Sequence, residues 1–336
     1  MTESISKEEK ALLVKGYTAM VLARTLDKKL VSAQRQGRIG FYTPMMGQEA
    51  SQVGLSMALL PEDFIYGYYR DIGLLIYRGG SIEALLNQAM GNSADSARGR
   101  QMPSHLMDKS VNFFTVPSMV GANLTLAVGT AYAYKMRKRK GIVAATFGDG
   151  ATSTPDFHAS MNFASVYDVP VLFFCENNQW AISYPVEKQS KTDISEKAKA
   201  YGIRGLKVDG NNLVDVYRTT RQAVESIRAG EGPILINAVS YRMGPHSTSD
   251  DPSKYRKDEI SEGSDRDPLV VTEKLLISMK VMDEHLPQAI KSQAEKIVDS
   301  KFEESEKIPP ASPEETFTDV YAEDSWMLQE ERGDLL

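Results

Sequence analysis

The chain has 336 residues, and its 45 acidic residues against 39 lysines and arginines give a net charge of −6. This balance argues against nucleic acid or an anionic membrane as the main partner, and the longest apolar run, residues 169–175, is far shorter than the roughly 20 residues that span a bilayer. The only cysteine, Cys175, excludes an intramolecular disulfide and a cysteine-based zinc site, and it fits a reducing compartment. Because residues 1–10 carry glutamates and no apolar core, no signal or transit peptide is predicted, and we expect a cytoplasmic protein.

The first part of the chain is predicted to be mostly helical. Residues 1–35 and 47–60 have helical patterns, and residues 81–90 form a short helix for which Ser81 is the expected N-cap. Residues 121–140 are rich in glycine and alanine and end in a run of basic residues. We expect this last helix to be buried, because small side chains let another backbone approach closely.

Short apolar runs then alternate with helical patterns. The expected strands are residues 142–147, 171–175, 205–208 and 233–239, and the expected helices between them are residues 154–167, with Thr154 as N-cap, and 213–229. This order predicts an α/β fold with a mainly parallel sheet and helices on both faces.

The rest of the chain is a long polar loop, residues 243–267, and a helical segment over residues 267–306. A loop of this length is usually functional or mobile. We divide the chain into an N-terminal helical extension, residues 1–40, an α/β domain, residues 41–262, and a C-terminal helical extension and tail, residues 263–336.

The strongest chemical signal is a pair of motifs at the ends of two consecutive strands. Gly148-Asp149-Gly150 follows the first strand, and Asn177-Asn178 follows the second. Parallel strands joined by a right-handed crossover bring their carboxyl ends to one edge of the sheet, where ligands bind. One carboxylate and one amide oxygen, with glycines that let a ligand approach the backbone, suit Mg²⁺ bound to a diphosphate. Gly-Asp-Gly alone is more often a simple turn, but its pairing with Asn-Asn favours the metal site.

At this point the sequence resembles a known family. The strings over residues 148–164, 66–70, 99–103 and 241–251 are similar to the α subunit of the E1 component of 2-oxo acid dehydrogenases, which are thiamine-diphosphate enzymes. The resemblance extends over residues 41–321 and implies the thiamine-diphosphate-binding fold. Within the family, the stretch from His246 to Asp251 is most similar to the branched-chain 2-oxo acid dehydrogenases.

The resemblance also implies roles for individual residues. Mg²⁺ would be held by Asp149, the side chain of Asn178 and the backbone carbonyl of Trp180. Thiamine diphosphate would contact the backbone at Gly150 and Ala151, and His246 would be the active-site histidine. The remaining cofactor-binding residues implied by the family pattern are Tyr69, Arg70, Ser118 and Val120.

Several of these residues also have a simpler interpretation. Arg70 by itself is typical of a surface ion pair, Val120 of core packing, and His246 of a solvated loop. Among the other histidines, His105 is a weaker candidate for the cofactor loop. His158 is expected to be structural, and His285 is expected to be exposed on a helix.

The sequence departs from the family pattern at two places. Glu176 stands where branched-chain members often have an arginine that contacts the diphosphate, and a carboxylate there would repel phosphate unless it points away. The potassium loop of the mammalian subunit is replaced, so no K⁺ site is expected; the residues at its place are Pro117, Met119, Ala122 and Asn123.

Ser247 lies where mitochondrial relatives are phosphorylated, and a phosphate there would repel the diphosphate.

The resemblance implies an incomplete active site in this chain. Thiamine activation needs a glutamate that the β subunit supplies, and Glu49 is better explained as an ordinary acidic residue at a helix start. We therefore expect an α2β2 heterotetramer that decarboxylates branched-chain 2-oxo acids and acylates the lipoyl domain of an E2 acyltransferase. The alternatives are a pyruvate or acetoin dehydrogenase α subunit and, from another class, a non-catalytic interaction subunit. A Mg²⁺-phosphate hydrolase is disfavoured because no second carboxylate is placed to activate water.

Overall fold

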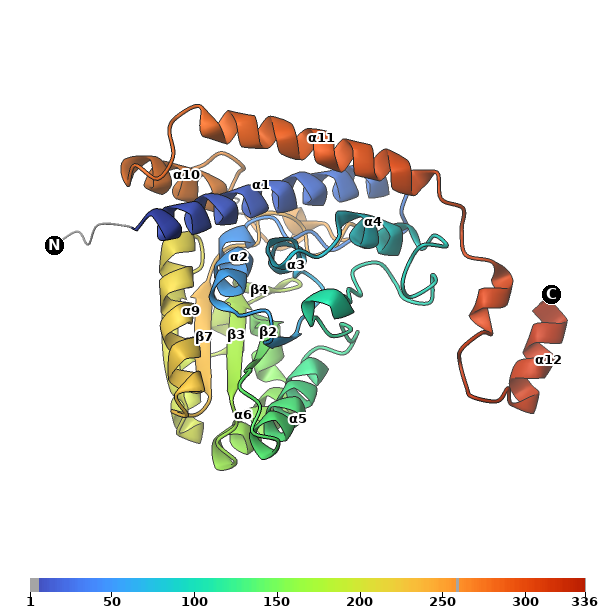
Figure 1. The fold of residues 1–336 in the computed structure, drawn as a ribbon, viewed down its shortest axis with the longest axis horizontal. Helices are drawn as coiled ribbons and strands as arrows, with labels where there is room; N and C mark the ends of the chain where they lie inside the picture. Colours follow the sequence, from blue (N-terminus) through green and yellow to red (C-terminus); the bar gives the residue numbers. More distant parts are fainter. Residues whose placement is uncertain (1–5, 258–259, 336) are drawn as a thin grey trace.

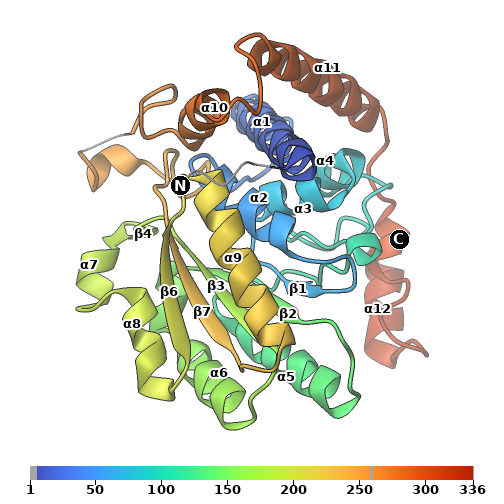
Figure 2. The same cartoon turned by 60° about the vertical axis from the view of Figure 1, so that its left-hand side comes forward.

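The computed structural model describes residues 6–257 and 260–335, so the first residues of the predicted N-terminal helix and the segment 1–5 lie outside the described residues. At its centre is a five-stranded sheet with the order β1-β2-β3-β7-β6, in which every pair is parallel (Figures 1 and 2). The strands are β1 Phe64–Tyr66, β2 Val143–Gly148, β3 Val171–Asn177, β6 Arg204–Asp209 and β7 Ile234–Val239. The predicted α/β class and its four strands are confirmed.

Both faces of the sheet are buried, in two separate hydrophobic clusters. Successive residues of β2 alternate between them: Val143 and Ala145 belong to one cluster and Ala144 to the other. Helices α5 Ala122–Met136 and α6 Pro155–Val166 cover the first face (Figure 2). Helices α2 Glu49–Ala58 and α9 Leu213–Arg228 cover the second. The alternation of side chains along a strand thus builds two cores from one apolar run.

A further layer of helices lies beyond α2. The long helix α1 Lys7–Arg35 packs against α3 Ile72–Arg78, α10 Pro268–Ser278 and α11 Leu286–Glu306, and α11 also contacts α4 Ile82–Met90 (Figure 1). The N-terminal and C-terminal helices are therefore neighbours, and the predicted division at residues 40 and 262 stays a prediction. Smaller elements are β4 Trp180–Ala181, β5 Tyr184–Pro185, α7 Val186–Gln189, α8 Ile194–Lys197, α12 Trp326–Leu335 and the 3₁₀ turns Lys109–Val111, Asp149–Ser153, Ala198–Tyr201, Pro252–Lys254 and Pro313–Thr316.

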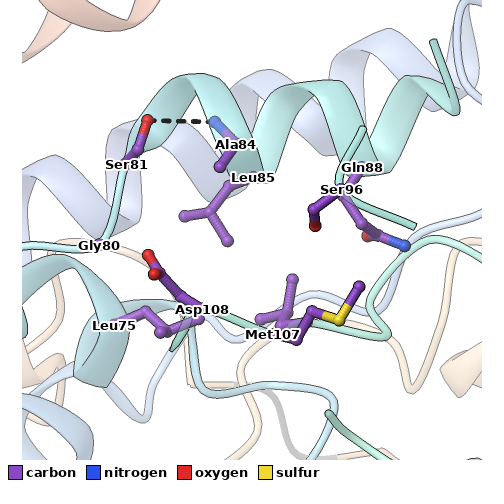
Figure 3. Close-up of a pocket in the computed structure, with 10 residues that line it drawn as sticks. Leu75, Gly80, Ser81, Ala84, Leu85, Gln88, Ser96, Met107 and Asp108 are labelled. Atoms are coloured by element: carbon purple, nitrogen blue, oxygen red, sulfur yellow. Dashed lines mark hydrogen bonds between the residues drawn. The ribbon is translucent and has the colours of Figure 1, made fainter. Parts of the chain in front are cut away.

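The two predicted N-caps are confirmed. The hydroxyl oxygen of Ser81 accepts a hydrogen bond from the backbone N–H of Ala84 at 3.2 Å (Figure 3). Thr154 accepts one from the N–H of Phe157 at 3.4 Å, with Pro155 in the first turn of α6. In both cases a side-chain oxygen pairs with an N–H that has no partner within the helix.

Three expectations about helices and strands need correction. The helical segment over residues 267–306 is two helices, and Pro287, which cannot continue a preceding helix, lies in the first turn of the second. Helix α5 is only partly buried, since its small residues Gly129 and Ala133 are exposed. Strand β1 and the β4–β5 hairpin were not predicted, because runs of two or three residues carry no period.

The register of the sheet sets the position of the two motifs. Gly148 of β2 pairs with Glu176 of β3, and Asn177 pairs with Val239 of β7. The strands therefore end side by side, and the residues that follow them share one edge, as predicted. Within the described part of the chain, no helix is long and apolar enough to cross a membrane.

Candidate active site

A cavity of about 330 Å³ opens beside the carboxyl ends of the strands. It is bounded by the turn after β2, the segment after β1, the N-terminal side of α5 and the loop that follows β7. The structure brings six predicted cofactor residues into its wall: Tyr69, Ser118, Val120, Gly150, Ala151 and His246. These residues are spread over much of the sequence, so their convergence is a property of the fold.

The three predicted metal ligands are grouped at the same strand ends. Asp149 and Asn178 are buried, and the Asn178 amide oxygen accepts a hydrogen bond from the N–H of Trp180 at 3.2 Å. Gln189 donates to Asp149 Oδ2 at 2.9 Å. Burial raises the pKa of the Asp149 carboxyl, while the Gln189 hydrogen bond and nearby guanidinium charges oppose that rise.

The donor atoms and the local backbone fit a magnesium diphosphate. A carboxylate, an amide oxygen and a backbone carbonyl are all hard oxygen donors, which Mg²⁺ prefers. A side chain at Gly150 would place its Cβ 2.8 Å from Cβ of Ala181, so only glycine leaves this backbone accessible from the cavity. No group of three His, Cys, Asp or Glu able to hold a metal occurs among the described residues, so a metal here would depend on neutral oxygens as well as on Asp149.

Two buried arginines make this edge of the sheet positive. Arg70 hydrogen-bonds to the carbonyl of Pro44 and, through Nη2, to His246 O at 2.8 Å. Arg242 donates to the carbonyl of Trp180 at 3.2 Å. The Nε atom of each arginine is buried without a hydrogen-bond partner in the described structure. Burial and the charge of Arg70 lower the pKa of Arg242 to about 10. Two cations that burial makes costly indicate a site for an anion.

His246 is half-buried and lies against Arg70, so the solvated-loop interpretation is wrong. Its Nδ1 is 3.0 Å from Nη2 of Arg70. Because a guanidinium can only donate, Nδ1 is the acceptor, and the ring proton is therefore on Nε2. Burial, together with the charges of Arg70 and Arg242, lowers the pKa of His246 to about 3. At neutral pH the ring is therefore uncharged and offers an N–H donor.

The structure also separates the other candidates. Val120 is 53% exposed, so the core-packing interpretation is wrong. His105 lies in the cavity wall, and its Nε2 is 2.5 Å from the hydroxyl of Ser118. His158 on α6 contacts the hydroxyl of Tyr201, and His285 is exposed, as expected for both.

Glu176 points away from the cavity into a polar cluster under the strand ends. Its Oε2 accepts from Nε2 of Gln52 at 3.0 Å and lies 3.1 Å from the hydroxyl of Tyr68. Its other oxygen and Oδ1 of Asp71 are buried without a hydrogen-bond partner in the described structure. Burial and the charge of Asp71 raise the pKa of Glu176 well above its ordinary value, which favours the neutral carboxyl. A neutral carboxyl bonded to Gln52 would not repel a phosphate as the sequence predicts for a carboxylate.

Sequence reasoning missed two residues of this site. Arg242 lay within the family string over residues 241–251 and could have been found there as a cation next to the active-site histidine. Gln189 had no sequence signal, because its contact with Asp149 depends on the hairpin between them. Glu49 is not a catalytic candidate: it is buried and its Oε1 lies 2.5 Å from Nε of Arg24.

A second crevice, between α4 and residues 106–108, is no candidate for a cofactor (Figure 3). Its volume is about 10 Å³, which is at most the space that one water molecule needs. Six of the predicted site residues thus line the cavity at the strand ends, whereas Arg70, Asp149, Asn178 and Trp180 are not among its lining residues.

Comparison with known proteins defines the class of the chain. The family model described as dehydrogenase E1 component matches residues 17–314. The chain therefore belongs to the dehydrogenase E1 component family, whose members generally depend on thiamine diphosphate.

Named relatives are similar over almost the whole chain. The 2-oxoisovalerate dehydrogenase subunit alpha, mitochondrial, of Caenorhabditis elegans is 40% identical over 326 residues, which cover 96% of this chain and 75% of the relative. The protein of the same name from Homo sapiens is 39% identical over 329 residues, covering 97% of this chain and 74% of the relative.

Proposed function

We propose that the chain is the α subunit of a thiamine-diphosphate-dependent E1 enzyme that decarboxylates branched-chain 2-oxo acids. The observation that carries the proposal is the grouping, at one edge of the sheet, of oxygen donors for a metal and two buried arginines next to a cavity whose wall includes the neutral His246. The similarity to 2-oxoisovalerate dehydrogenase subunits supports the choice of substrate class.

The residues of this chain hold the diphosphate end of the cofactor. Asp149, Asn178 and the carbonyl of Trp180 bind Mg²⁺, and the guanidinium groups of Arg70 and Arg242 neutralise the phosphates. When bound, thiamine diphosphate supplies the electron sink for the loss of CO₂ from a 2-oxo acid.

His246 and the apolar part of the cavity act on the substrate side. The neutral ring donates its Nε2–H to oxygen atoms of the substrate, while its Nδ1 remains bonded to Arg70. Apolar side chains line the cavity and would accept a branched aliphatic chain; they include Phe41, Met102, Met119, Val120 and Ile182.

A β subunit completes the active site in this proposal. The family pattern assigns the glutamate that activates thiamine to that partner, and the assembly is an α2β2 heterotetramer. The decarboxylated fragment would then reductively acylate the lipoyl group of an E2 acyltransferase, whose disulfide takes up the two electrons as one sulfur receives the acyl group.

The cofactor site is tested by calorimetry with thiamine diphosphate and Mg²⁺ on the complex with the β subunit. Asp149→Ala should weaken Mg²⁺-dependent binding by at least about 100-fold, because it removes the only carboxylate among the proposed ligands. Asp209→Ala is the matched control, since Asp209 is also followed by glycine and ends β6 of the same sheet. Unchanged binding by Asp149→Ala would contradict the metal site.

The substrate class is tested with the same complex by comparing decarboxylation of 4-methyl-2-oxopentanoate and pyruvate. A higher kcat/KM for the branched substrate is expected. Equal or better turnover of pyruvate would refute the branched-chain assignment and favour a pyruvate dehydrogenase subunit.

A further inference from the structure

The turn that carries Asn178 is connected to a chain of buried polar side chains, of which Tyr68 also lines the cavity. Asn178 Nδ2 donates to Oε1 of Gln48 at 3.0 Å. The hydroxyl of Tyr68 lies 3.1 Å from that same Oε1 and 3.1 Å from Oε2 of Glu176. Gln48 and Glu176 are fully buried, so these contacts are not exchanged with bulk water.

The two ends of the Asn178 amide are chemically opposite, and a metal needs the oxygen end. The backbone N–H of Trp180 can only donate, so the atom that faces it at 3.2 Å is Oδ1. The other end is therefore the amino group, whose acceptor is Gln48. A carbonyl oxygen has two lone pairs, so Oδ1 keeps one for Mg²⁺ after it accepts from Trp180.

Gln48 can accept the hydrogen bond from Asn178 only while the oxygen of its own amide, and not the nitrogen, faces Asn178. Its oxygen faces both Nδ2 of Asn178 and the hydroxyl of Tyr68, and its own amino group donates to the carbonyl of Met45 at 3.4 Å. The single proton of the Tyr68 hydroxyl is shared between Oε1 of Gln48 and Oε2 of Glu176. Glu176 fixes the position of Tyr68 from the other side. Glu176, which stands where the family often has an arginine, is thus the last member of this hydrogen-bond chain. It is not proposed to bind phosphate.

We propose that Gln48 and Tyr68 are positioning residues, which orient the amide of Asn178 so that its oxygen faces the Mg²⁺ of the cofactor. This inference rests on the proposed function, because it assumes that Asn178 is a ligand. It goes beyond that function by assigning a role to two residues that are not among the proposed ligands of the metal or the phosphates.

The test measures the dissociation constant of Mg²⁺ at saturating thiamine diphosphate, on the complex with the β subunit. Gln48→Met removes the acceptor at nearly constant volume, and Tyr68→Phe removes only the hydroxyl. Each should weaken Mg²⁺ binding about 10-fold or more, as is usual for residues that hold a metal ligand in place. At saturating Mg²⁺ most of kcat should return, because the ligand is still present.

Matched controls separate orientation from general stability. Tyr66→Phe removes the hydroxyl of a tyrosine two residues from Tyr68, whose bond at 2.7 Å is to Thr130. Ser56→Ala removes a buried hydroxyl from helix α2, which Gln48 precedes. Both controls should keep Mg²⁺ affinity within twofold of the wild type, while thermal unfolding reports any loss of stability.

The double variant Gln48→Met with Tyr68→Phe provides an independent outcome. Because both residues act through one amide, the double variant should bind Mg²⁺ about as weakly as Gln48→Met alone. Wild-type Mg²⁺ affinity in Tyr68→Phe, or an equal loss in Tyr66→Phe, would overturn the inference. A wild-type complex that binds no thiamine diphosphate in the presence of Mg²⁺ would instead contradict the proposed function.

Discussion

The depressed pKa of His246 makes a quantitative prediction about stability and pH. The ring pKa falls from 6.5 to about 3 in the folded chain, because burial and the charges of Arg70 and Arg242 disfavour the imidazolium. The unfolded chain keeps the ordinary value near 6.5. Between these two values the unfolded chain binds one more proton than the folded one. The contribution of the neutral His246 ring to the free energy of unfolding is therefore fully present above pH 6.5, and it is lost as the pH falls toward about 3.

The size of the effect follows from linkage. Each pH unit within this window costs about 1.4 kcal/mol. Lowering the pH from 7.5 to 5.5 moves one unit below 6.5, so His246 should reduce the free energy of unfolding by about 1.4 kcal/mol. Other groups also titrate, but their contributions cancel when the wild type is compared with His246→Gln, which keeps an acceptor for Arg70 and has no titrating ring.

The assay is urea denaturation of both proteins at pH 7.5, 6.5 and 5.5. The wild type should lose about 1.4 kcal/mol more than His246→Gln over this range, and His285→Gln, at the exposed N-cap position before α11, should behave like the wild type. NMR of the ring protons gives a direct check, because the chain has only four histidines. A midpoint near 6.5 for His246, or equal losses in the two proteins, would refute the argument.

Two other substitutions test the cavity floor and the helical layer. Gly150→Val brings a side chain against Ala181, because even its Cβ would be 2.8 Å from Cβ of Ala181. Calorimetry should therefore show that thiamine diphosphate binds at least about tenfold more weakly. Unchanged affinity would mean that the β4–β5 hairpin moves away from residue 150 at little cost. Glu49→Ala leaves the buried guanidinium of Arg24 without its 2.5 Å partner, and chemical denaturation should show a loss of about 3 kcal/mol, whereas a loss below about 1 kcal/mol would mean that Asp267 alone satisfies Arg24.

The strands of the sheet could be predicted where an apolar run is several residues long and is bounded by residues typical of turns. The apolar runs that became β2 and β3 are bounded by glycine and asparagine, and the N-cap threonine before Pro155 marked the start of α6. Strand β1 has three residues, and it is a strand only because β2 lies beside it. Short elements of this kind are set by tertiary pairing and leave no period in the sequence.

The site shows the same division between local and distant information. Asp149 and Asn178 follow strands directly, so their shared edge could be inferred from topology. The neutral state of His246 could not, because it depends on Arg70 and Arg242, which are far from it or unmarked in the sequence. The raised pKa of Glu176 likewise depends on burial and on the charge of Asp71, and only folding brings the two carboxyls together.

The contact between Arg70 and His246 joins positions 176 residues apart, and it exists only when the segment after β1 and the loop after β7 are both in place. A ligand that binds there recognises the whole fold and has no partial site to bind in the unfolded chain. Its binding free energy therefore adds fully to the stability of the chain, by about 2.7 kcal/mol at a concentration 100 times its dissociation constant. Ligand binding at this site thus stabilises the folded chain, and the amount of folded subunit should depend on the concentration of the ligand.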